Sequence, residues 1–310
     1  MLLSFLVRTS EEVAVALTWN GKKLDWTNVI YFSVIHAGAL LAPWMFSWTA
    51  LGIALFLYWL TASVGITLTY HRLLTHRGFR IPKPLEYLFT LCGMLASEGG
   101  AITWVAMHRL HHTLSDREGR DLHTPKDGFW WSHVGWILSD KYKDTDFAAI
   151  KDFARYPELR WLDKHEGMPP WIYGIAAFTI GGLVGTGGGW SWTGAWAGLV
   201  IGFFWSTVLL WHTTFLVNSA AHVFGRRRYE TTDTSRNSLI IALLTGGEGW
   251  HNNHHHYQAS ARQGFFWWEV DPTYYGLKIM SWFGIVKDLK APPARVLRPD
   301  PHPEEELVAA

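Results

Sequence analysis

Two long stretches of the chain contain no charged side chain. Residues 28–70 and 167–225 lack Asp, Glu, Lys and Arg altogether, although charged residues make up 17% of the sequence. A helix that crosses a bilayer needs about 20 predominantly apolar residues, so each stretch is long enough for two crossings. We therefore predict an all-α integral membrane protein with four transmembrane helices, at residues 28–46, 49–70, 170–185 and 194–217. Pro43 and the glycine-rich residues 185–192 mark the turns within the two stretches.

The basic residues indicate how these helices are oriented. All 27 Lys and Arg residues lie in residues 1–27, 71–166 and 226–310, and none lies in either predicted turn. Because basic residues are enriched on the cytoplasmic side of membranes, we expect both termini and the 71–166 segment to be cytoplasmic. The apolar segment 85–107 contains Glu86 and Glu98, and we interpret it as a helix at the membrane interface rather than a fifth crossing.

Composition excludes several other classes of protein. The formal net charge is +1, which gives no basis for binding nucleic acid. A single cysteine, Cys92, excludes both a disulfide within the chain and a metal site built from several thiolates. Residues 291–310 are rich in proline and acidic side chains and are predicted to be disordered, which leaves residues 1–290 as a single membrane domain.

Histidine carries the strongest functional signal. Nine of the 16 histidines fall in four short motifs, HRLLTH, HRLHH, NSAAH and HNNHH. Residues three and four apart share a face of a helix, so we predict that the polar side chains of each of the last three motifs converge on one point. The first motif has its histidines five apart, which suits the end of a helix. The residues concerned are His71 and His76; His108, His111 and His112; Asn218 and His222; and His251, His254 and His255.

Nine imidazoles indicate a site for two metal ions. Neutral imidazole is a good ligand for iron, copper and zinc, and nine are too many for one ion. The motifs contain no Asp or Glu, which argues against the soluble di-iron design that uses Glu-x-x-His pairs. The other histidines are not expected to be metal ligands. We assign core or surface positions to His36, His165, His212 and His302, and positions beside the metal ligands or in the scaffold to His123 and His133. His256 follows the last motif directly and is only a minor candidate for a ligand.

At these motifs the chain resembles the membrane fatty acid desaturases, and specifically the Δ9 acyl desaturase branch. That branch is marked by HX4H, HX2HH, HX2HH and NX3H boxes, all of which are present. The stretches SHVGW (132–136), LVNSAAH (216–222) and EGWHNNHH (248–255) are also similar, and the resemblance covers about residues 30–285. It implies four transmembrane helices under a cytosolic helical cap that holds two non-heme irons. The implied iron ligands are His71, His76, His108, His111, His112, His222, His251, His254 and His255, with Asn218 acting through a water.

The same resemblance implies an O2-dependent enzyme that introduces a cis double bond, at Δ9, into a saturated acyl chain. No electron-carrier domain is recognisable after His255, so the resemblance implies an external donor, either a ferredoxin or cytochrome b5. It places Trp104, Thr214 and Phe215 at the bend of the acyl chain and the end wall of the tunnel at Trp59 and Ser63.

Two departures from the branch concern the substrate. Phe215 stands where animal members often have tryptophan, which affects the bend. Acyl-CoA members often carry Arg-Asp just before the second box, whereas this chain has Ala106 and Met107. The acyl carrier is therefore either CoA or a lipid.

Two rival functions remain open from the sequence. A hydroxylase or monooxygenase with the same metal chemistry would insert oxygen instead of forming a double bond. A membrane heme or metal protein without enzymatic activity is the second rival. Paired heme ligands would face each other inside the bilayer, whereas the histidine motifs here lie outside the predicted spans.

Overall fold

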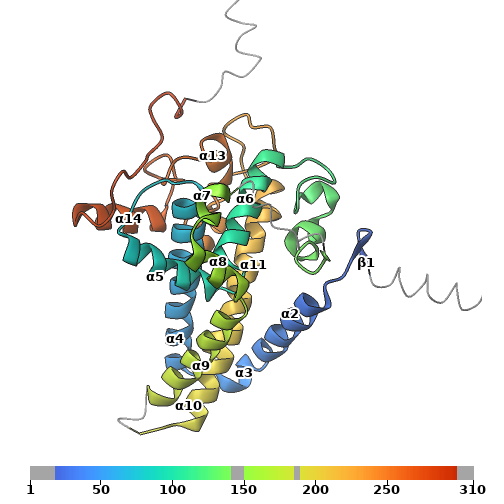
Figure 1. Cartoon of the computed structure of the whole chain (residues 1–310), viewed down its shortest axis with the longest axis vertical. Coiled ribbons are helices and arrows are strands. Elements are labelled where there is room, and N and C mark those ends of the chain that lie inside the picture. The colour runs from blue at the N-terminus through green and yellow to red at the C-terminus, as the bar shows by residue number, and fades with distance from the viewer. Residues whose placement is uncertain (1–17, 141–149, 185–188, 299–310) are drawn as a thin grey trace, which may run out of the picture.

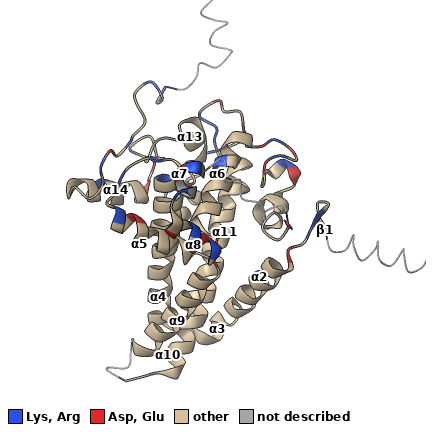
Figure 2. Cartoon of the chain, in the orientation of Figure 1, with Lys and Arg blue, Asp and Glu red and all other residues tan. Residues whose placement is uncertain are grey.

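The computed structural model describes residues 18–140, 150–184 and 189–298. Within these residues the protein is helical apart from one short hairpin, β1 (Thr18–Trp19) and β2 (Lys22–Lys23). An apolar bundle occupies one end of the molecule, and shorter helices form a cap at the other end (Figure 1). Charged side chains gather on the cap and hairpin, and the far end of the bundle carries none (Figure 2).

Two helices of the bundle are long and apolar enough to cross a membrane. One runs from Trp48 to Thr75, and consists of α4 (Trp48–Tyr58) continued by the π-helix η1 (Trp59–Thr75). The other runs from Trp192 to His222 and joins α10 (Trp192–Ala197), η6 (Gly198–Trp205), α11 (Ser206–Asn218) and η7 (Ala220–His222). These helices coincide with the predicted spans at 49–70 and 194–217, which supports association with a membrane.

The other two predicted spans correspond to shorter helices. The segment 28–46 forms α2 (Trp26–Ala39), of 14 residues, and α3 (Ala42–Met45), with Pro43 in the first turn of α3. The segment 170–185 forms α9 (Met168–Leu183), of 16 residues. Both are shorter than the roughly 20 residues of a typical crossing. The predicted turn at 185–192 lies partly outside the described residues, since 185–188 are not described.

Small residues let α9 lie close to α10 and η6. A Cβ atom on Gly181 would come within 2.3 Å of the Gly194 carbonyl oxygen, and one on Gly198 would come within 2.3 Å of the Ala177 oxygen. Glycine is therefore required at this contact, which resembles the small-residue interfaces of membrane helices. Outward-facing tryptophans surround the bundle, and Trp44, Trp48, Trp171 and Trp192 are all exposed.

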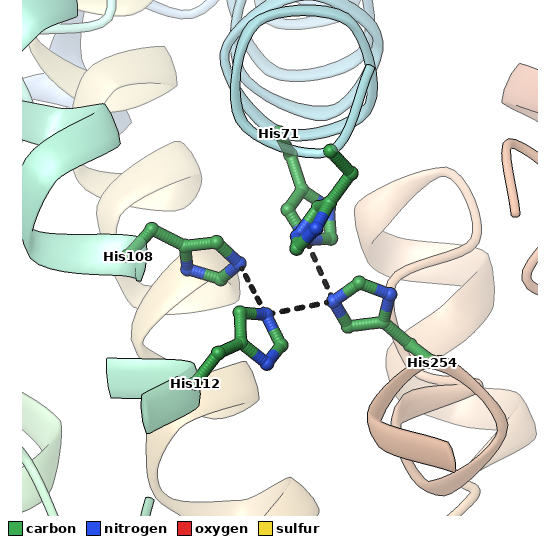
Figure 3. A group of neighbouring side chains, drawn as sticks. His71, His108, His112 and His254 are labelled. Atoms are coloured by element: carbon green, nitrogen blue, oxygen red, sulfur yellow. Dashed lines mark hydrogen bonds between the residues drawn. The ribbon is translucent and has the colours of Figure 1, made fainter. Parts of the chain in front are cut away.

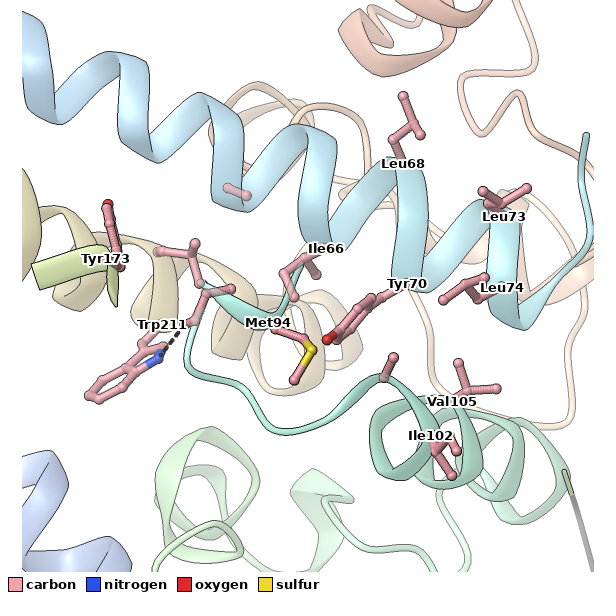
Figure 4. Close-up of a cluster of buried hydrophobic side chains, with 14 of the residues drawn as sticks. Ile66, Leu68, Tyr70, Leu73, Leu74, Met94, Ile102, Val105, Tyr173 and Trp211 are labelled. Atoms are coloured by element: carbon pink, nitrogen blue, oxygen red, sulfur yellow. Dashed lines mark hydrogen bonds between the residues drawn. The ribbon is translucent and has the colours of Figure 1, made fainter. Parts of the chain in front are cut away.

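The cap packs around the C-terminal end of η1, which carries His71. Its helices are α5 (Lys83–Met94), α6 (Ala101–Leu114), η2 (Pro125–Asp127), η3 (Trp131–Gly135), α7 (Lys151–Ala154), α8 (Pro157–Lys164), α12 (Leu239–Thr245), α13 (His251–His256) and α14 (Pro272–Trp282). The hydrophobic core joins η1 to α5 and α6, as Ile66, Tyr70 and Leu74 lie near Met94 and Ile102 (Figure 4).

Two segments, 85–107 and the C-terminal tail, differ from the prediction or are only partly described. The segment 85–107 is not one interfacial helix but parts of α5 and α6, separated by a break in which Ser97 and Gly99 have φ of 60° and 97°. Gly99 allows this left-handed backbone because it has no Cβ atom. In the predicted disordered tail, residues 291–298 form neither helix nor strand, and residues 299–310 lie outside the described residues.

Candidate active site

The structure brings all nine histidines of the four motifs into two neighbouring groups. Within each group, the side-chain nitrogens that could bind a metal lie within 4.8 Å of one another. Figure 3 shows four rings of the larger group with their nitrogens turned toward one another. The larger group consists of His71, His76, His108, His112 and His254, and the smaller group consists of His111, His222, His251 and His255.

The π-helical geometry of η1 explains the five-residue spacing of the first motif. The backbone N–H of His76 donates to the carbonyl of His71, at 3.2 Å. This i→i+5 bond is the defining bond of a π-helix, and it places residues five apart on the same face. The two rings accordingly lie 4.8 Å apart, measured between their centroids.

The prediction that each HX2HH motif converges on one point is wrong. On α6, His108 and His112 join the larger group, and His111 joins the smaller one. On α13 the division is reversed, since His254 joins the larger group and its neighbour His255 the smaller. Consecutive residues of a helix point about 100° apart. A helix between two sites can therefore supply both of them, and α6 and α13 do so.

Four buried carboxylates hold the histidine rings from behind. The Nδ1 atom of His222 lies 3.0 Å from Asp116, that of His111 lies 3.1 Å from Asp121, and that of His255 lies 2.7 Å from Asp233. His71 is paired in the same way with Glu248. A carboxylate that accepts a hydrogen bond from Nδ1–H leaves the Nε2 lone pair free to face a metal, as at many histidine metal sites.

Hydrogen bonding keeps these carboxylates ionised despite their burial. Burial alone raises the pKa of Asp116, Asp121 and Asp233, but the bonds they accept outweigh it and hold each pKa well below its usual range. The carboxylates lie outside the motifs, so reasoning from the histidine boxes missed them. Two of them could have been recognised by their proximity in sequence, because Asp116 and Asp121 follow the second box within one loop.

The chemistry of the two groups fits metal ions. Burial and neighbouring imidazoles lower the pKa of His108, His112, His251 and His254 well below the usual range, so these rings are neutral, the form that binds metal. Pairs of Nε2 atoms face each other at 3.0 Å, in His71–His254 and in His222–His251. Such convergent lone pairs suit an ion at the centre of each group.

A cavity of about 380 Å³ begins at the larger histidine group. His108, Trp104 and Asn218 line one part of it, and the ring of Trp104 stacks on that of His108 at 4.9 Å between centroids. Residues from α2, including Tyr31 and Phe32, form the opposite wall. The expected bend residues Trp104, Thr214 and Phe215 all line this cavity, and so does Asn218.

The expected end wall at Trp59 and Ser63 does not border this cavity. Trp59 is 52% exposed and packs on Phe56, and Ser63 lies against Gly246. Trp59 and Ser63 are four apart and would share a face of an α-helix, whereas residues 59–75 form a π-helix, in which residues five apart share a face. Phe32 and Trp211 line the cavity. The outward position of Trp59 is typical of the aromatic belt at a membrane interface.

Comparison with known proteins identifies the family. A family model described as fatty acid desaturase matches residues 29–277. The chain belongs to the fatty acid desaturase family. It is 44% identical over 271 residues to the sn-1 stearoyl-lipid 9-desaturase of Anabaena variabilis, covering 86% of this chain and 94% of that protein.

Two further relatives show the range of the family. The chain is 41% identical over 278 residues to the sn-2 palmitoyl-lipid 9-desaturase of Nostoc sp. (strain 36), covering 88% of this chain and 93% of that protein. It is 38% identical over 279 residues to the icosanoyl-CoA 5-desaturase of Limnanthes douglasii, covering 88% of this chain and 74% of that protein. The chain is thus an oxidoreductase, a fatty acyl desaturase.

Glu98 is a carboxyl group within the desaturase cavity that the sequence reading did not use for function. Its Oε2 accepts a hydrogen bond from the Trp104 indole N–H at 3.3 Å, and it also bonds Thr214. Its Oε1 is buried without a hydrogen-bond partner among the described residues. Burial raises the pKa of Glu98 to about 7. Glu98 therefore changes charge near neutral pH, beside Trp104 and Thr214, two of the three expected bend residues.

We expect the apparent affinity for a saturated acyl substrate to fall as pH rises through about 7. Above its pKa, Glu98 carries a charge that an apolar chain would desolvate further. Measurement of KM against pH checks this, and Glu98→Gln, which keeps the shape and the bond from Trp104, should flatten the profile. An unchanged pH dependence of KM in this variant would exclude Glu98 as the cause of that dependence.

The free energy of unfolding changes with pH in the same direction. It decreases as pH rises between about 4.5 and 7, because the pKa of Glu98 is higher in the folded protein than in the unfolded chain.

Proposed function

We propose that this desaturase introduces a Δ9 cis double bond into the acyl chain of a lipid. The two histidine groups beside an apolar cavity are the observation that carries the proposal. Two of the relatives quoted above are named as acyl-lipid 9-desaturases. A lipid carrier also agrees with Ala106 and Met107, which provide no charged group before the second box. An acyl-CoA remains the alternative carrier, since one relative is named as a CoA desaturase.

In this proposal each histidine group holds one iron. The five imidazoles of the larger group would hold one iron, and the four of the smaller group would hold the other. Asn218 would act on one of them through a water, as the family resemblance implies. When bound, the irons supply the O2 chemistry that removes one hydrogen from each of two neighbouring carbons, which acid–base groups cannot do. Asp116, Asp121, Asp233 and Glu248 orient the imidazoles.

The cavity residues determine which carbons react. Trp104 stacks on His108 and is held by Glu98, so its ring has a fixed position beside the larger group. Thr214 and Phe215 approach the same part of the cavity from α11. A chain held between these side chains presents a fixed pair of carbons to the irons, which is a positioning effect. The cavity is apolar on the α2 side, where Phe32 stacks on Trp211 at 5.3 Å.

Expression in a host that lacks unsaturated fatty acids tests this function. We expect membrane lipids with a new cis double bond at carbon 9 and no hydroxylated product. Recovery of a hydroxy acid would favour the rival monooxygenase reaction, and a heme absorption band with no product would favour the non-enzymatic alternative. To distinguish the two carriers, isolated membranes are supplied with a labelled acyl chain either in a lipid or as a CoA thioester. The form in which the double bond appears identifies the carrier.

We also propose four crossings, with both termini and the active site in the cytoplasm and with α2 and α9 serving as the short spans. The one-sided distribution of charge in Figure 2 supports this orientation. A cysteine introduced at Ser191, in a Cys92→Ser background, should react with a membrane-impermeant reagent only from the outside. Ser191 caps the first turn of α10 at the uncharged end of the bundle. Labelling from the cytoplasmic side would exclude this topology.

A further inference from the structure

A row of aromatic rings leads away from the smaller histidine group. The ring of His111 lies 4.3 Å from that of His123, and the ring of His123 lies 4.9 Å from that of Trp136, between centroids. His123 and Trp136 are both buried and both line the cavity, and His123 lies outside the two groups of nine histidines, beside His111 and Asp121. Successive ring contacts therefore run from His111 through His123 to Trp136, and such short steps between aromatic rings suit electron transfer.

The row continues into a small core beneath the β-hairpin. Trp136 packs with Trp131 and Leu122, and Trp19 of β1 packs against the same cluster. The hairpin turn is Asn20-Gly21, with φ of 50° and 70°, the turn favoured in two-residue hairpins. Asn20 donates to the Asp127 carbonyl at 2.7 Å, which holds the hairpin onto η2. The path therefore reaches a fixed part of the surface.

The surface over this cluster is basic. We call it the hairpin patch, and it consists of the hairpin, the loop 117–120 and η2. Gly119 of the loop donates its N–H to the Asp127 carboxylate at 3.3 Å, so the three segments are contiguous. The patch has one exposed carboxylate, that of Glu118, and five exposed cations. The cations are Lys22, Lys23, Arg117, Arg120 and Lys126. Figure 2 shows the basic residues of the hairpin.

Desaturation needs electrons that the substrate does not supply. A saturated chain, O2, two electrons and two protons give the double bond and two waters. We take the donor to be a separate one-electron carrier protein, and complexes of such carriers have small interfaces of less than about 1,200 Å². A basic patch attracts an acidic carrier and accelerates the encounter.

We propose that the hairpin patch is the docking surface for an acidic one-electron carrier protein, and that electrons pass through Trp136 and His123 to His111. The inference rests on the proposed two-iron function. The rival basic segment is Arg226–Arg228, but Arg228 is paired with Glu269, and Arg227 donates to the Thr231 and Asp233 carbonyls. No aromatic path comparable to that of the hairpin patch connects this segment to the site among the described residues.

Charge reversal tests the docking surface. The iron-loaded full chain in detergent is titrated with a [2Fe–2S] ferredoxin and, in parallel, with cytochrome b5. Lys22→Glu/Lys23→Glu should raise the Kd of the preferred carrier at least about tenfold and reduce its salt dependence. The matched reversal Arg226→Glu/Arg295→Glu, at two exposed positions elsewhere, should leave Kd within twofold. An unchanged Kd in the hairpin variant, or equal weakening in the control, would overturn the proposal.

Replacing Trp136 tests the path separately. Trp136→Leu should leave the carrier's Kd unchanged while slowing reduction of the irons by the bound carrier at least tenfold, and Trp136→Phe should restore part of the rate. Dithionite, which needs no docking surface, should reduce both variants at the wild-type rate. Equal slowing with dithionite would overturn the proposed path. Neither measurement depends on product, so failure to find a double bond would refute the proposed function without changing these results.

Discussion

Replacing His254 with alanine should abolish desaturation while leaving the protein inserted in the membrane. The Nε2 atom of His254 lies 3.0 Å from the Nε2 atoms of both His71 and His112, so this side chain is central to the larger group. Under the proposed ligation, its loss opens one side of an iron site. Even partners that only orient a ligand are worth about 10–100-fold in metal affinity or activity, so removal of a ligand should exceed about 100-fold.

The neighbouring His256 provides the matched control. It belongs to the same HNNHHH run, but its ring stacks on Tyr229 at 4.0 Å between centroids and faces neither group. His256→Ala should therefore retain both irons and most of the activity. Product formation and iron per chain are measured on both variants after purification. Equal activity in the two variants would contradict the two-iron site, and the outcome for His254 should be shared by His71, His111 and His222.

Much of this site could be predicted because histidine motifs are local in sequence. The nine positions need only short-range spacing to be recognised, and the structure places all nine in the two groups. Their division between the groups could not be predicted in this way. His111 and His112 are adjacent on α6, and their separation depends on where α13 packs against α6, which is a tertiary property.

The fold shows the same limit of local reasoning. The uncharged stretches predicted the two long helices, because a crossing helix is apolar over its whole length. The π-helical form of η1 has no comparable signal in composition, and Trp59 and Ser63 within it do not line the described cavity. The hairpin did have a recognisable signal, since Asn20-Gly21 is a strong turn pair, but the short strands around it show little alternation.

The carboxylates behind the histidines were missed for a physical reason. Asp233 and Glu248 contact His255 and His71 across separations of 22 and 177 residues, so no spacing rule within a motif reveals them. They become visible only when burial is known. An ionised carboxylate inside a protein requires partners, and a buried Asp beside a neutral histidine therefore indicates a functional arrangement.

The second large effect is expected for Asp116, which joins three segments of the site. Its carboxylate accepts from His222 Nδ1 at 3.0 Å, from the Thr234 backbone N–H at 2.6 Å and from the Thr124 hydroxyl at 2.8 Å. Asp116 has φ of 58°, a left-handed conformation that Asn also adopts readily. Asp116→Asn therefore keeps the size and backbone of the residue and removes its charge.

We expect Asp116→Asn to lower iron affinity about 10–100-fold, because His222 loses the anion that orients its ring and increases its basicity. Iron retained per chain, measured during dialysis against increasing chelator concentrations, checks this result. Asp163→Asn is the matched control, since Asp163 accepts the N–H groups of Ile102 and Thr103 at the start of α6 and touches no histidine group. It should cost about 1 kcal/mol of stability or less, seen as a lower Tm, with iron retention unchanged. Equal iron loss in both variants would mean that Asp116 only supports the fold of the cap.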